Sequence, residues 1–78
     1  MNSHARIEAQ LRTSKWSPGP SREGETVWLG PGDLRCTVSR KVAVFHNCRN
    51  GVKTGQRSHQ IWYDLEMIIG HIRNHACD

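Results

Sequence analysis

Basic side chains cluster in the middle of the chain, in a stretch without acidic residues that suits contact with phosphate groups. No Asp or Glu occurs from Leu34 to Gln60. Arg and Lys bind phosphates by charge and hydrogen bonding, and a stretch without acid adds no opposing repulsion. The alternative is a solvated polar face and an edge strand that its charge protects from pairing. The candidate residues for binding nucleic acid or another partner are Arg35, Arg40, Lys41, Arg49, Lys53 and Arg57.

Thiol and imidazole groups raise the alternative of a structural zinc site. The candidate ligands are Cys36, Cys48, His71 and His75. Zinc in a structural site takes four ligands that converge tetrahedrally, and the two cysteines lack the close spacing with which one turn presents two sulfurs. Small buried core residues are the simpler interpretation of both cysteines. We therefore predict no cofactor, with zinc as the alternative.

Two further pairs of residue types are compatible with catalysis, but their spacing is not. His46 and Cys48 would lie on one face of a strand about 7 Å apart, which is beyond hydrogen-bond reach. Asp64 and Glu66 would point in different directions from a helix, so they do not form an acid and base pair. We predict that the protein is not an enzyme.

The stretch from Leu34 to Arg49 has the alternating pattern of a half-buried strand. Its even-numbered positions are mainly apolar and its odd-numbered positions mainly polar, which places Phe45 as the one outward aromatic residue. Arg40 interrupts the apolar series. We therefore expect a bend or bulge at residues 39–41 that divides the segment into two strands.

The sequence Arg49-Asn50-Gly51 predicts a hairpin turn. A three-residue loop would pair Cys48 with Val52 and keep Val52 on the apolar face, with Gly51 in the left-handed conformation of a bulged hairpin. A two-residue loop would place Val52 on the polar face, so we prefer the three-residue loop. The returning strand, which continues through Thr54 and Gln56, would be a polar edge.

A helix is predicted from about Ser58 to His75, with Ser58 as its N-cap. Gly70 inside it either allows another backbone to approach closely or is tolerated. The helix carries one apolar stripe that would cover the sheet, formed by Ile61, Trp62, Leu65, Ile68, Ile69, Ile72 and Ala76.

These elements predict an α+β fold: a small antiparallel sheet of three or four strands, packed by one C-terminal amphipathic helix, with a short N-terminal helix or flexible arm. Residues 1–25 would form the arm and a linker, with a short helix at 3–12 as one alternative and Trp16 either docked or free for a partner. Residues 26–78 would form the single domain, beginning with a strand at Thr26–Leu29.

Length, charge and hydropathy limit the function classes. A chain of 78 residues forms one small core, which argues against a deep enzyme pocket. The net charge of +4 favours an acidic partner. The three cysteines cannot all pair with each other, and the chain has neither the apolar segment of a signal peptide nor that of a membrane span. We expect a cytoplasmic protein, in the host cytoplasm if phage-encoded, without a membrane partner.

The leading hypothesis is a small non-enzymatic protein that acts on nucleic-acid machinery, with the basic hairpin contacting nucleic acid or a transcription complex. In size and composition the chain also looks like small phage or mobile-element proteins. The alternative is therefore an inhibitor that binds a host assembly, such as RNA polymerase or a CRISPR effector complex, through its N-terminal arm and edge strand. The apolar contacts of such a surface would come from Trp16, Phe45, Tyr63 and Met67.

Overall fold

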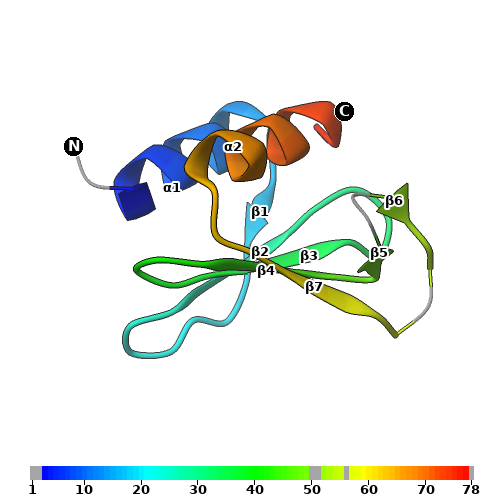
Figure 1. The fold of residues 1–78 in the computed structure, drawn as a ribbon, viewed down its shortest axis with the longest axis horizontal. Coiled ribbons are helices and arrows are strands. Elements are labelled where there is room, and N and C mark those ends of the chain that lie inside the picture. Colours follow the sequence, from blue (N-terminus) through cyan, green and yellow to red (C-terminus); the bar gives the residue numbers. More distant parts are fainter. Residues whose placement is uncertain (1–2, 50–51, 56, 78) are drawn as a thin grey trace.

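Two helices lie side by side on one face of an antiparallel sheet in the computed structural model of the chain (Figure 1). The structure describes residues 3–49, 52–55 and 57–77. The α+β class is therefore confirmed. No helix in these residues is long and apolar enough to cross a membrane.

The main sheet has five strands, more than the three or four predicted, in the order β1-β2-β3-β4-β7. The additional strands lie at its two edges, because a short β1 pairs with β2 and β7 pairs with β4. Strands β5 and β6 form a separate two-stranded sheet. The strand bounds are β1 Ser17–Pro18, β2 Thr26–Leu29, β3 Arg35–Val38, β4 Ala43–His46, β5 Cys48–Arg49, β6 Val52–Lys53 and β7 His59–Trp62.

The N-terminal segment forms helix α1, Ser3–Thr13, which packs beside helix α2. Of the two alternatives for this segment, the structure has the helix. Ile7 and Leu11 are buried, and Trp16 docks against the C-terminal segment, where its Nε1 donates to the carbonyl oxygen of His75 at 3.0 Å. Nearby, the amide of Cys77 donates to the carbonyl oxygen of Ser14 at 2.8 Å. The buried core thus draws residues from both sides of residue 25.

Helix α2 spans Leu65–Asn74, so the predicted start at Ser58 is wrong. Asp64 is the N-cap, and its carboxylate accepts a hydrogen bond from the amide of Met67 at 3.0 Å. Residues His59–Trp62 instead form β7, with Ile61 more exposed than Trp62 as the alternation of an edge strand requires. Aromatic and β-branched residues suit such a strand, and pairing with β4 outweighs their helical spacing.

The expected bend at residues 39–41 is a tight turn between β3 and β4, closed by a hydrogen bond from the Ser39 amide to the Val42 carbonyl at 2.9 Å. Val38 pairs with Ala43 across this turn, and cross-strand partners lie on the same face of a sheet. The inward positions therefore change from even to odd. Phe45 is fully buried, so its predicted outward position is wrong.

The inward positions change back at Asn47, whose φ of 65° lies in the left-handed region. Cys48 is consequently buried, whereas His46 lies on the opposite face. In the β5–β6 hairpin Arg49 pairs with Val52, so the preferred three-residue loop is wrong and Val52 is 63% exposed. The turn residues 50 and 51, like Gln56 of the predicted edge, lie outside the described residues.

Phe45 is the centre of the core, which fills the space between the sheet and the two helices. Its ring meets Trp16, Trp62 and His71 edge-on, with centroid distances of 6.4, 5.6 and 4.3 Å. These contacts join helix α2 and the segment that follows α1 to β4 and β7. Gly70 makes no close approach, because a Cβ there would meet nothing within 4 Å outside its own helix backbone.

Candidate nucleic-acid interface

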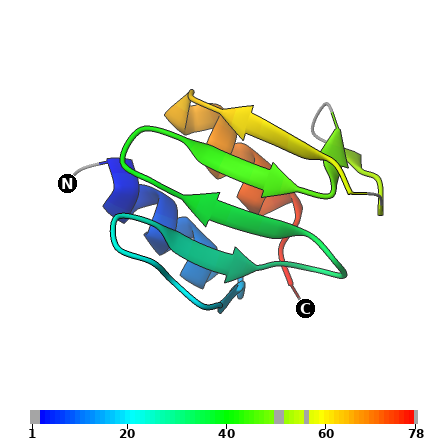
Figure 2. The same cartoon turned by 90° about the horizontal axis from the view of Figure 1, so that it is seen from below.

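The sheet has one face away from the helices, which Figure 2 views directly. Cross-strand partners share a face, so the register of β2, β3, β4 and β7 arranges the outward side chains in two rows. The apolar row consists of Val27, Thr37, Val44 and Ile61. The basic row consists of Leu29, Arg35, His46 and His59.

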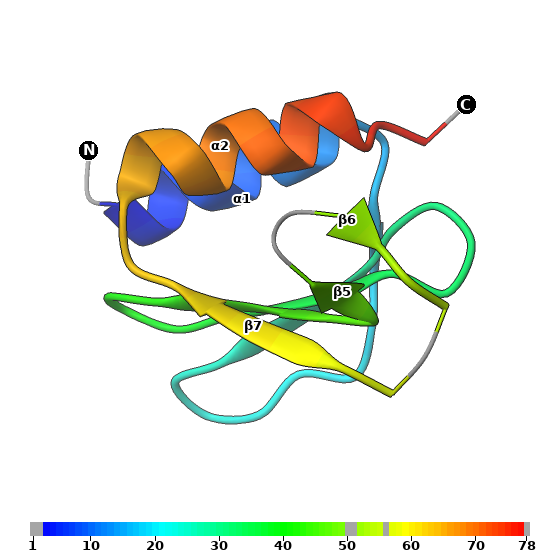
Figure 3. The same ribbon diagram turned by 45° about the vertical axis from the view of Figure 1, so that its right-hand side comes forward.

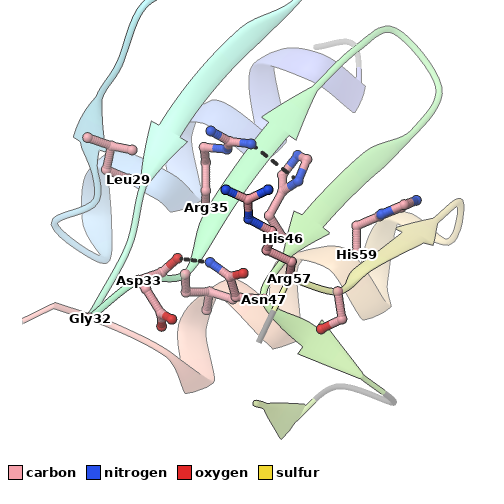
Figure 4. Close-up of a pocket in the computed structure, with 10 residues that line it drawn as sticks. Leu29, Gly32, Asp33, Arg35, His46, Asn47, Arg57 and His59 are labelled. Atoms are coloured by element: carbon pink, nitrogen blue, oxygen red, sulfur yellow. Dashed lines mark hydrogen bonds between the residues drawn. The ribbon is translucent and has the colours of Figure 1, made fainter. Parts of the chain in front are cut away.

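Two members of the basic row, Arg35 and His46, are joined by a side-chain contact (Figure 4). The Arg35 guanidinium lies 3.4 Å from His46 Nδ1, and His46 Nε2 lies 3.3 Å from the Thr37 hydroxyl. Arginine can only donate, so Nδ1 accepts and the proton of the neutral ring resides on Nε2. The ring centroids of His46 and His59 are 6.2 Å apart. The row therefore presents one permanent cation beside two imidazoles.

Burial lowers the pKa of His46, and the nearby Arg35 and His59 lower it further. The ring is accordingly neutral at pH 7. A phosphate group placed between these residues would offset the repulsion among them, because an anion favours the protonated form of an imidazole. The site can thus gain positive charge when an anion binds.

Arg57 enters the same region from the loop before β7. With Arg35, His46 and His59 it lines a hollow of about 630 Å³ (Figure 4). Asp33 also lines this hollow, and its carboxylate forms an ion pair with Lys53 at 3.4 Å. The acid that immediately precedes the acid-free stretch is therefore partly neutralised by one of the predicted basic residues.

The six predicted basic residues do not form one patch. Arg35 and Arg57 meet in the hollow, and Arg49 lines a smaller neighbouring one with Arg57. Arg40 and Lys41 lie in the turn at the other end of the β3–β4 hairpin, in a separate hollow that Arg22 and Glu25 also line. The predicted set is split between the two ends of the sheet, while Lys53 pairs with Asp33.

Sequence reasoning did not assign His46 and Thr37 to this site. The expected alternation turned His46 inward, and Thr37 was not singled out among the polar positions. The break at residues 39–41 was expected, but the tight turn that forms it also reverses which residues of the following strand face outward, and this reversal was not.

The proposed zinc ligands are only partly brought together. Cys48 Sγ lies 3.8 Å from His71 Nε2, and the rings of His71 and His75 are 4.4 Å apart. Cys36 lies in the sheet opposite Phe45. Within residues 3–49, 52–55 and 57–77, no group of three or more His, Cys, Asp and Glu side chains is placed to hold a metal ion.

The buried Cys and His side chains have the character of core groups. Burial raises the pKa of the Cys36 thiol. Burial also lowers the pKa of His71 to about 4, with His75 adding to the effect. A protonated thiol and a neutral imidazole provide neither a thiolate nucleophile nor a cation at neutral pH.

Comparison of the chain with protein families, with curated proteins and with solved structures gave no match.

Proposed function

We propose that the protein is a non-enzymatic binder of nucleic acid that acts on nucleic-acid machinery such as a transcription complex. The observation that supports this best is the convergence of Arg35 and Arg57 with His46 and His59 in one hollow on the open face of the sheet. The charge in this hollow is suited to phosphate oxygens.

The proposed contact is with the backbone and not with stacked bases. One guanidinium N–H of Arg35 is directed at His46, so the other N–H groups of this guanidinium are available to donate to a phosphate. The two outward rows contain aliphatic, hydroxyl, imidazole and guanidinium groups, whereas base stacking uses Phe, Tyr or Trp rings on an exposed sheet. Phe45, the aromatic residue of the hairpin, is buried.

The test is a titration of labelled DNA and RNA by fluorescence anisotropy at several salt concentrations. Phosphate contacts release counterions, so the logarithm of the affinity should fall linearly with the logarithm of the salt concentration. Arg35→Ala and Arg57→Ala should each weaken binding and reduce the slope by about one. Arg40→Ala is the matched control from the other end of the hairpin and should leave the slope unchanged. Absence of binding at low salt would contradict the proposal.

A protein partner within a host assembly is the second candidate. Helix α1 offers it little, because Ile7 and Leu11 are buried against the rest of the chain. Its support is the edge of the sheet at β7, beside which Tyr63 of the following loop and Met67 of helix α2 are exposed. Capture of a host complex that survives nuclease and high salt, without binding of the purified protein to nucleic acid, would favour this candidate.

A further inference from the structure

Strand β7 ends the five-stranded sheet on the side beyond β4 (Figures 2 and 3). The Asn47 amide donates to the Ser58 carbonyl, which marks these two residues as a hydrogen-bonded pair in the register of β4 and β7. Bonded and non-bonded pairs alternate in an antiparallel ladder, so Gln60 and Trp62 bond to β4. His59 and Ile61 therefore direct their backbone groups away from β4, toward the open edge.

This edge is bordered by apolar side chains. Ile61, Tyr63 and Met67 are 48, 72 and 58% exposed, and the three line one hollow together with the side of Trp62. Natural proteins usually protect a sheet edge with Lys, Pro or a bulge, and the sequence His59–Trp62 contains neither residue and pairs in continuous register. An exposed edge with apolar neighbours is a surface for strand pairing.

We propose that β7 pairs antiparallel with β7 of a second copy of this chain, around a two-fold axis that passes between the two Ile61 residues. In this register the Ile61 residues exchange two backbone hydrogen bonds, N–H of each to C=O of the other. His59 of each copy lies opposite Tyr63 of the second copy. The inference is independent of the proposed nucleic-acid binding.

The order of charges along this segment selects a second copy as the occupant. Arg57 and His59 precede Ile61, while Asp64 follows it; Glu66, which also follows, already forms an ion pair with Arg6 at 3.3 Å. A two-fold axis at Ile61 reverses this order in the second copy. The basic end of each strand then lies opposite the acidic end of the other, and the two Ile61 residues lie opposite each other. A surface that is its own complement is what a two-fold interface requires.

The axis also keeps the open faces of both sheets on the same side, because it runs perpendicular to the strands' common plane. The apolar row then continues from Ile61 of one copy to Ile61 of the other. The two basic rows lie on opposite sides of the axis, so a dimer would present the hollow twice on one continuous surface.

The experiment is sedimentation velocity of the full chain over a range of concentrations. The proposal expects a reversible dimer, and Ile61→Lys should weaken self-association by about tenfold or more because two like charges would meet on the axis. Leu29→Lys is the matched control: it lies on the same face, is 45% exposed and belongs to β2, away from the proposed axis. This variant should dimerise as the unchanged protein does.

Amide hydrogen exchange by NMR provides a second readout that does not depend on a variant. The amide of Ile61 should exchange slowly at concentrations where the dimer forms and quickly after dilution, while the amide of Trp62, which bonds to β4, should stay protected in both. A chain that remains monomeric at millimolar concentration would overturn the proposal. So would a dimer that Ile61→Lys leaves intact, or one in which the Ile61 amide exchanges at the monomer rate.

Discussion

The imidazole of His71 meets the ring of Phe45 edge-on, with 4.3 Å between the ring centroids and an interplanar angle of 70°. His71 is only 6% exposed, and its Nε2 is directed at the Cys48 thiol. Burial therefore lowers the pKa of His71 to about 4, and the nearby His75 adds to this effect. The folded protein holds this imidazole neutral at the centre of its core.

The stability of the protein should consequently fall with decreasing pH. The unfolded chain binds a proton at His71 near its ordinary pKa of about 6.5, whereas the folded chain does not until about pH 4. The stabilisation is complete above about pH 6.5 and is lost as the pH falls toward 4, by about 3 kcal/mol in total. Urea unfolding at pH 7.5 and pH 5 would measure it. His71→Gln should flatten this dependence, and His59→Gln should not; equal slopes in both variants would contradict the assignment.

Gly30 is a position where an added methyl group should disrupt the packing of the core. A Cβ there would lie 2.7 Å from the ring of Trp16, which is buried and hydrogen-bonded to His75. Gly30→Ala should lower the free energy of unfolding by about 1–3 kcal/mol, as overpacking does. Gly70→Ala is the control with the opposite sign, since its methyl group enters open space inside a helix and should stabilise the protein by up to about 1 kcal/mol. Equal effects in urea unfolding would contradict this geometry.

Leu11→Ala should test how firmly helix α1 belongs to the core. Leu11 is fully buried, so its truncation should cost about 2–5 kcal/mol of unfolding free energy. Leu29→Ala removes the same atoms from a side chain that is 45% exposed and should cost much less. If both variants melted like the unchanged protein, α1 would be a detached arm in solution.

The elements with strong local signals could be predicted from the sequence. The strand Thr26–Leu29 was expected with its observed bounds, and the apolar stripe from Leu65 to Ile72 identified the C-terminal helix. Its start was misplaced because Ile61 and Trp62 fit both a helical stripe and an edge strand. Asp64, a common N-cap residue, was the signal for the true boundary.

The faces of the sheet could not be derived from alternation alone. One alternating pattern was expected to extend from Leu34 to Arg49, whereas the turn after Val38 and the left-handed Asn47 each reverse it. Each reversal depends on the conformation of one short segment, yet it moves every later side chain to the other face. For that reason Arg35 was predicted at the site and its neighbour His46 was not.

The contact between the two ends of the described chain has a consequence for biosynthesis. Trp16 and His75, which are 59 residues apart, are joined by a hydrogen bond, and Ser14 is joined to Cys77. A growing chain on the ribosome cannot form these contacts until the segment that contains His75 and Cys77 has left the exit tunnel. Helix α1 is synthesised before the segment that it packs against, so we expect its packing to form late in folding.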